Sequence, residues 1–117
     1  MQRAYRLKKN KHFQTVYRRG KSQASKDLVL LYFRSRRLQI GISVSKKVGN
    51  AVARNKVKRR VREIMRSEMQ LLKPGWYVIA ARPGAAQATF QGLKKTLRYL
   101  LRKHDLYTAE DKGSNRQ

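Results

Sequence analysis

Cysteine is absent from this chain of 117 residues. Its absence excludes a disulfide framework, a thiolate zinc site and a cysteine nucleophile, and it favours a reducing compartment. Long apolar runs are absent too, because no stretch approaches the roughly 20 residues that a membrane helix needs and no apolar segment follows the charged N-terminus as in a signal peptide. The length fits one domain over residues 1–117. We also expect a cytoplasmic location and no membrane partner.

Acidic side chains are scarce. The six are Asp27, Glu63, Glu68, Asp105, Glu110 and Asp111. Hydrolases with two catalytic carboxylates need a facing pair, and two-metal nucleases need several acids around ions roughly 3.5 to 4 Å apart. The sequence shows no such cluster, and His12 and His104 lie far apart in helical patterns, where a surface or half-buried imidazole is expected. We predict no catalytic residue, metal site or cofactor in the protein itself.

Positive charge, in contrast, is abundant. The 30 Lys and Arg residues and the 6 Asp and Glu residues give a formal net charge of +24, while 40% of the residues are hydrophobic. This hydrophobic content separates the chain from a disordered basic tail. Charge of one sign destabilises a compact state and attracts phosphate groups at long range. We expect a polyanionic partner, with nucleic acid as the first candidate.

Hydrophobic periodicity predicts six elements. They are a helix over 11–19, a strand over 28–33, an alternating strand over 38–45, a helix over 51–72, a strand over 76–81 and a helix over 89–103. Their order is α-β-β-α-β-α, with room for one extra short strand. This order predicts an α+β fold, a small mixed sheet packed with three helices in a two-layer sandwich. Residues 105–117 are expected to fray, although Leu106 and Tyr107 can pack back.

Local signals add three expectations. Asn10 is expected to cap the first helix, and Gly20 to end it in the left-handed conformation. A loop is expected over residues 21–26. Five aromatic side chains are expected in the core: Phe33, Trp76, Tyr77, Phe90 and Tyr99.

The strand over 38–45 alternates strictly between apolar and small or polar residues. The apolar positions are Leu38, Ile40, Ile42 and Val44. The other face carries Gly41 and Ser43 among its small or polar residues, which is typical of a strand with one buried side. The small side chains leave room for a ligand to approach this face.

The helix over 51–72 has a basic side. Its apolar side gathers Val57, Val61, Ile64, Met65, Leu71 and Leu72, and we assign Glu68 to an exposed edge of that side. The opposite arc consists of Asn55, Lys58, Arg59, Arg62 and Arg66. A solvated helix face normally mixes both signs, whereas residues 46–62 hold eight cations and no acid. Cations also crowd the helix N-terminus, where the macrodipole favours anions. The pattern therefore indicates that phosphate groups bind along this side.

A long run of residues carries a family resemblance. Residues 41–63, GISVSKKVGNAVARNKVKRRVRE, strongly resemble the signature of the bacterial ribonuclease P protein subunit. The resemblance continues through residues 6–9 with Phe13 and Tyr17, the strand over 76–82 and the helix over 97–101, and thus covers nearly the whole chain apart from the tail. The sequence departs from the family at Lys56, where the family has Arg, so a point charge replaces a two-pronged guanidinium there. It departs again at Leu31, where the family often has an aromatic residue facing its cleft, while Tyr32 falls on the opposite face.

The resemblance implies a function and two partners. In this family, a large catalytic RNA cuts the 5′ leader from precursor tRNA, and that RNA holds the Mg²⁺ and performs the hydrolysis. The basic helix faces the RNA subunit, while a cleft between the first helix and the sheet receives the single-stranded leader. The resemblance also implies a left-handed crossover around the long helix, where the general rule alone favours a right-handed one. No protein oligomer is expected.

The resemblance also assigns the site residues. The expected contacts with the RNA subunit are Lys46, Lys47, Asn50, Arg54, Asn55, Lys56, Lys58, Arg59, Arg62 and Arg66. The expected leader cleft contains Arg6, Phe13, Tyr17, Leu31 and Ser43. For Phe13 and Tyr17 two roles stay open, because their rings can fasten the first helix to the sheet or stack on leader bases.

Three other functions fit parts of the sequence. A ribosomal protein has similar size and charge, but the signature over 43–63 is much longer than a generic basic patch. An architectural DNA-binding protein is expected to have an arm or ribbon for the minor groove, and none is visible. A stand-alone nuclease needs more acids than this chain has.

Overall fold

The structure is a computed structural model that describes residues 5–108. Its elements are α1 (Asn10–Arg19), β1 (Lys21–Ala24), β2 (Leu28–Phe33), β3 (Gln39–Val44), α2 (Ala51–Glu68), β4 (Trp76–Ala81) and α3 (Phe90–Lys103). Short 3₁₀ turns occur at Lys46–Val48, Met69–Leu71 and Pro83–Ala86. The predicted α+β class is confirmed, and β1 is the extra short strand, which replaces the loop expected over 21–26.

The four strands form one mixed sheet in the order β1-β2-β4-β3. β1 and β4 both pair antiparallel with β2, whereas β3 pairs parallel with β4. A parallel pair needs a crossover connection, and α2 supplies it between β3 and β4. The left hand of this crossover stays a prediction. The segment before α1 adds a parallel bridge between Arg6 and Ile40, so it extends the sheet beyond β3.

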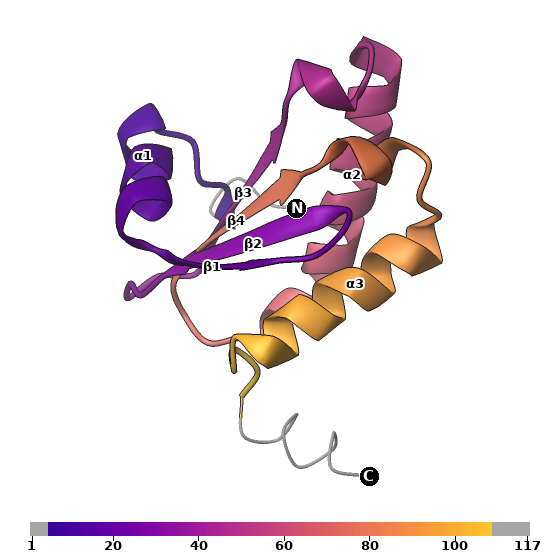
Figure 1. Ribbon diagram of the computed structural model, residues 1–117. Coiled ribbons are helices and arrows are strands. Elements are labelled where there is room, and N and C mark those ends of the chain that lie inside the picture. Colours follow the sequence, from indigo (N-terminus) through magenta and orange to yellow (C-terminus); the bar gives the residue numbers. More distant parts are fainter. Residues whose placement is uncertain (1–4, 109–117) are drawn as a thin grey trace, which may run out of the picture.

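Helices cover both faces of the sheet (Figure 1). α2 and α3 pack on one face, where the larger core includes Leu30, Ile40 and Tyr77. α1 packs on the other face, where a second core includes Leu31 and Val78. Strand side chains point to alternate faces, so neighbouring residues of β2 enter different cores. The sheet with α2 and α3 forms the predicted sandwich, and α1 adds a small third layer.

The alternation predicted for β3 is present. Ile40 is buried in the larger core, and Leu38, Ile42 and Val44 pack against that core while half-buried. Gly41 lies on the opposite face, beneath α1. The register pairs Leu31 with Val78 and Tyr32 with Tyr77. Leu31 therefore faces α1 and Tyr32 faces α2 and α3, as the sequence count predicts.

Both predictions for the ends of α1 are wrong. The helix begins at Asn10 itself, and the carbonyl of Lys9 accepts the amide hydrogens of His12 and Phe13, with no side-chain cap. Gly20 is extended, with φ −76° and ψ 161°, because the chain enters β1 directly. A Cβ at Gly20 would lie 2.6 Å from the carbonyl oxygen of Val16, so close packing explains the glycine.

The chain after α3 packs against the end of α2. Leu106 and Tyr107 are 3% and 2% exposed, and the amide of Lys73 donates to the carbonyl of Leu106. The frayed tail predicted from residue 105 therefore does not begin there, and its remaining part, 109–117, lies outside the described residues. Tyr107 also corrects the prediction for Glu68, which is buried because the Tyr107 hydroxyl donates to its Oε1 at 2.6 Å.

Two side chains that were predicted to be buried are exposed instead. Tyr99 is 52% exposed, because the buried stripe of α3 consists of Leu93, Leu97, Leu100 and Leu101. Leu71 is also exposed, since α2 ends at Glu68 and Leu71 lies in a 3₁₀ turn that departs from the helical spacing, whereas Leu72 is buried as predicted. Of the other aromatics predicted in the core, Tyr77 is buried, and Phe33, Trp76 and Phe90 pack against the cores while half-buried.

Candidate nucleic-acid interface

One side of α2 presents cations to solvent. Its stripe follows the helical spacing of three to four residues and consists of Asn55, Lys58, Arg59, Arg62 and Arg66, with Lys56 beside it. The opposite stripe is buried in the larger core and includes Val57 and Val61. Apolar burial therefore fixes the rotation of the helix, and this rotation aims the cations outward. We call these six residues the α2 arc.

The N-terminus of α2 is fixed by its own polar groups. The Asn50 side chain accepts a hydrogen bond from the amide of Ala53 at 2.9 Å and caps the helix. Arg54 Nε donates to the carbonyl of Gly49 at 3.2 Å, so this guanidinium holds the turn as well as adding charge. Lys46 and Lys47 lie exposed in the preceding 3₁₀ turn. Together these groups leave the positive end of the helix dipole next to exposed cations, an arrangement that favours an anion.

The arginines of α2 differ in their protein partners. Arg60, which lies between the two stripes, donates to the carbonyl of Ala88 at 2.8 Å and ties α2 to the segment before α3. Arg66 forms an exposed ion pair with Glu63 at 2.9 Å. Among the residues that the structure describes, Arg59 has no hydrogen-bond or ion-pair partner. Arg59 is therefore free to bind a phosphate, whereas Arg60 is occupied.

A hollow of about 290 Å³ lies at the β3 edge of the sheet. We call it the β3 hollow, and it is lined by Arg6, Leu7, Lys8, Phe13, Ile40, Gly41, Ile42, Lys58 and Arg62. Residues that were predicted to contact the leader therefore line the same hollow as residues that were predicted to contact the RNA subunit. Within residues 5–108, its lining includes four cations and no carboxylate.

Phe13 forms part of the floor of the β3 hollow through its contact with Gly41. A Cβ at position 41 would lie 2.5 Å from Cζ of Phe13. Only glycine lets the ring approach the strand this closely. The ring is half-buried against the core that contains Leu7 and Leu31, so it fastens α1 to the sheet and still keeps an accessible side.

The other residues predicted for the leader cleft take different places. Leu31 is 8% exposed and supports the sheet beneath α1. Tyr17, one helical turn after Phe13, is 42% exposed. Ser43 is half-buried two residues beyond Gly41, on the same face of β3. Neither Tyr17 nor Ser43 lines the β3 hollow. Sequence reasoning missed Lys8, which does line it, although the run 6–9 contained the signal.

The acids and histidines lie apart from one another. Within residues 5–108, no three His, Asp or Glu side chains gather closely enough to hold a metal ion. Glu63 pairs with Arg66, Glu68 is held by Tyr107, and Asp105 lies 3.7 Å from Lys73. No helix in the described part of the chain has the length and apolar character for crossing a membrane.

Comparisons with known proteins identify the family of this chain. A family profile described as Ribonuclease P matches residues 1–105. The chain belongs to the ribonuclease P protein family. The ribonuclease P protein component of Bacillus velezensis is 46% identical over 110 residues, which are 92% of this chain and 95% of that protein. The component from Listeria monocytogenes is 43% identical over 106 residues, with 87% of this chain and 89% of that protein covered.

Solved structures of the family share the fold. The RNase P protein of Staphylococcus aureus superposes with a TM-score of 0.84 at 34% identity, and the match covers 91% of this chain and 100% of that chain. The RNase P protein of Thermotoga maritima gives a TM-score of 0.74 at 30% identity, with 83% of this chain and 96% of that chain covered. The family and the fold class predicted from the sequence are both confirmed.

Proposed function

We propose that this chain is the RNA-binding protein subunit of ribonuclease P, which assists a catalytic RNA in removing the 5′ leader from precursor tRNA. The α2 arc binds the RNA subunit, and the β3 hollow binds the single-stranded leader. One copy of the protein acts in the cytoplasm without a cofactor of its own. We assign the Mg²⁺ to the partner RNA, since the His, Asp and Glu side chains of the described residues form no converging set of ligands.

The observation that carries this proposal is a continuous cationic surface that connects the two sites. Lys58 and Arg62 belong to the α2 arc and also line the β3 hollow beside Arg6. Phosphates on one RNA are therefore neutralised next to the place where a second strand enters. Charge-assisted hydrogen bonds from Lys and Arg hold phosphates well, and aromatic faces such as that of Phe13 accept bases with little sequence preference.

The protein contributes binding and positioning rather than bond cleavage. Holding the leader beside the RNA subunit reduces the freedom of the substrate and aligns the scissile phosphate with the catalytic RNA. The chain's cations also screen the repulsion between the two RNA backbones. General acid or base chemistry by the protein is not part of this proposal.

The leader site is tested with the assembled complex and two substrates. Lys8→Gln and Phe13→Ala are compared with the unchanged protein for binding of precursor tRNA and mature tRNA. Each change should weaken precursor binding roughly tenfold, which corresponds to the loss of one phosphate contact or one stacked base. Mature tRNA, which lacks the leader, should bind as before.

Lys26→Gln is the matched control, because Lys26 is exposed in the turn between β1 and β2 and lies outside the β3 hollow. Unfolding by urea separates binding from stability for Phe13→Ala, whose ring also packs beneath α1. If Lys8→Gln and Phe13→Ala both keep the full preference for precursor over mature tRNA, the hollow is not the leader site.

A further inference from the structure

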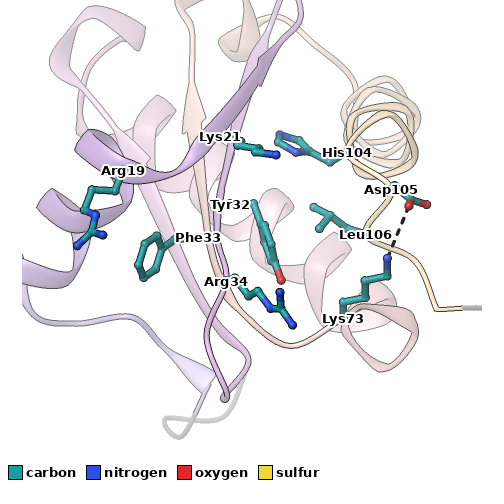
Figure 2. Close-up of a pocket in the computed structure, with 9 residues that line it drawn as sticks. All are labelled: Arg19, Lys21, Tyr32, Phe33, Arg34, Lys73, His104, Asp105 and Leu106. Atoms are coloured by element: carbon teal, nitrogen blue, oxygen red, sulfur yellow. Dashed lines mark ion pairs between the residues drawn. The ribbon is translucent and has the colours of Figure 1, made fainter.

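A second basic hollow lies at the other edge of the sheet (Figure 2). Its volume is about 460 Å³, and we call it the β1 hollow. It is lined by Arg19, Lys21, Tyr32, Phe33, Arg34, Lys73, His104, Asp105 and Leu106. These side chains come from the end of α1, the start of β1, the end of β2, the segment before β4 and the end of α3. Segments far apart in the sequence thus converge on one concave surface.

Positive charge dominates the β1 hollow. Among the described residues that line it, Asp105 is the one carboxylate, and it lies 3.7 Å from Lys73 Nζ. Within the described part of the chain, Lys21 and Arg34 have no acidic partner. The guanidinium of Arg19 lies 5.8 Å from the centre of the Phe33 ring, which is a cation–π distance. These cations repel one another, and an anion between them would relieve that repulsion.

The walls of the β1 hollow are held in place before any ligand binds. The Tyr32 hydroxyl donates to the carbonyl of Pro74 at 2.5 Å, and its ring meets the Tyr77 ring edge to face at 5.0 Å. His104 Nε2 lies 3.3 Å from the carbonyl of Leu30. A site fixed in this way spends little free energy on ordering when it binds.

The pKa of His104 depends on its burial and on the charges in the β1 hollow. Burial lowers the pKa of this imidazole, the hydrogen bond to the Leu30 carbonyl opposes that effect, and the charge of Lys21 lowers the pKa further. Tyr32 and Lys73 also line the hollow, and Asp105 is the adjacent acid. A phosphate in the hollow would favour the imidazolium and raise the pKa of His104.

The β1 hollow and the α2 arc belong to opposite edges of the sheet. β1 and β3 are the two edge strands. α2 packs over β3, whereas the hollow adjoins the start of β1 and the end of β2. Three strand spacings of roughly 4.8 Å separate the two edge strands by about 14 Å. An RNA segment on the α2 arc therefore lies across the width of the sheet from one in the hollow.

We propose that the β1 hollow is a third RNA-binding site, which takes the phosphodiester backbone of an RNA segment different from those on the α2 arc and in the β3 hollow. The proposal rests on the proposed function for its choice of RNA as the polyanion. Arg19, Lys21 and Arg34 bind phosphates, and the half-buried faces of Tyr32 and Phe33 support the ribose and base beside them. The protein would thereby hold a further RNA segment at the sheet edge opposite the other two sites.

The test is a titration of the isotope-labelled full chain, followed by nuclear magnetic resonance. The probes are a single-stranded oligouridylate of twelve nucleotides and, separately, inorganic phosphate. With oligouridylate, the amide signals of Lys21 and Arg34 should shift, and the pKa of His104 should rise. In the double variant Lys21→Gln and Arg34→Gln, affinity measured from signals at the hollow should fall roughly tenfold or more, while signals on α2 still shift.

The matched control is Lys26→Gln with Lys95→Gln, which removes the same charge from exposed positions outside the hollow. It should leave the affinity at the hollow within about twofold, because distant surface charges are screened by salt. If the control pair lowers the affinity for oligouridylate at the hollow as much as Lys21→Gln with Arg34→Gln does, the loss comes from net charge alone and the proposal is wrong.

Failure of the two proposals is distinguishable. If oligouridylate shifts signals on α2 but none at the β1 hollow, RNA binding at the β1 hollow is rejected and the proposed function stands. If inorganic phosphate shifts the hollow signals and oligouridylate does not, the hollow is a free-anion site and its assignment to RNA is wrong. If the hollow responds while α2 stays silent toward both oligouridylate and ribonuclease P RNA, the proposed function fails at α2.

Discussion

Glu68 is a buried acid that depends on a hydroxyl far along the chain. Tyr107 donates to Glu68 Oε1 at 2.6 Å, and Arg98 Nε lies 3.7 Å from the same oxygen. Burial and the bond to Glu68 both raise the pKa of Tyr107, so the phenol stays protonated and keeps donating. A buried carboxylate that loses such a donor pays a desolvation cost.

Tyr107→Phe should therefore lower the free energy of unfolding by about 1 to 3 kcal/mol, measured by urea denaturation at neutral pH. Tyr99→Phe is the matched control, because Tyr99 is 52% exposed and its hydroxyl accepts a hydrogen bond from the exposed Lys103. The control should change stability by less than about 0.5 kcal/mol. Equal stability of both variants would mean that the hydroxyl of Tyr107 does not stabilise Glu68.

The sequence predicts burial well where it follows a period and poorly where it depends on a partner. Val57 and Val61 lie on the predicted stripe and are buried. Glu68 breaks that stripe, and nothing local reveals that Tyr107, 39 residues later, will pair with it. In the same way, the signature identifies Phe13, but only the structure shows that Gly41 makes room for its ring.

Two adjacent arginines of α2 should behave differently. Arg59→Ala should weaken assembly with the RNA subunit by about 1 to 3 kcal/mol, the range for a charge-assisted contact, and leave stability unchanged. Arg60→Ala should instead lower the free energy of unfolding by about 1 to 2 kcal/mol, because it removes the hydrogen bond to the Ala88 carbonyl.

Binding of ribonuclease P RNA and urea denaturation, both measured on each variant, check this contrast. The two changes remove equal charge from neighbouring positions, so each serves as the control for the other. Full RNA affinity in Arg59→Ala would take the centre of the α2 arc out of the interface.

At the scale of secondary-structure elements, hydrophobic periodicity and segment length predict the helices and the apolar strands but miss the short polar strand. α2, α3 and β2 to β4 are found because each has a clear apolar pattern. β1 escapes because its residues are mostly polar and exposed, and only pairing with β2 makes it a strand. The predictions for the two ends of α1 are wrong because helix capping depends on the direction in which the chain continues, and tertiary packing determines that direction.

Across the whole molecule, the net charge of +24 predicts salt-sensitive binding. If the four cations Lys56, Lys58, Arg59 and Arg62 each neutralise one phosphate, the slope of log K against log salt should be roughly −3 to −4. Titration of the RNA subunit with the protein at several salt concentrations gives this slope. Arg59→Ala should make it shallower by about 0.7 to 0.9, and a flat titration would contradict electrostatic binding.

At the same scale, composition predicts the partner class and the signature predicts the family. The β1 hollow could not be predicted, because its cations are spread from residue 19 to residue 73 and only the fold gathers them. The sequence also could not show that Lys58 and Arg62 line the β3 hollow, since this requires α2 to pass beside the segment before α1.

Reconstituted cleavage of precursor tRNA tests the central claim most directly. Purified protein, ribonuclease P RNA and both together are incubated with precursor tRNA at low Mg²⁺, and the released leader is quantified. The account predicts no cleavage by the protein alone at any Mg²⁺ concentration, slow cleavage by the RNA alone and fast cleavage by the two together. Mg²⁺-dependent release of the leader by protein that is free of RNA and of contaminating nucleases, or no gain when the protein joins the RNA, would contradict it.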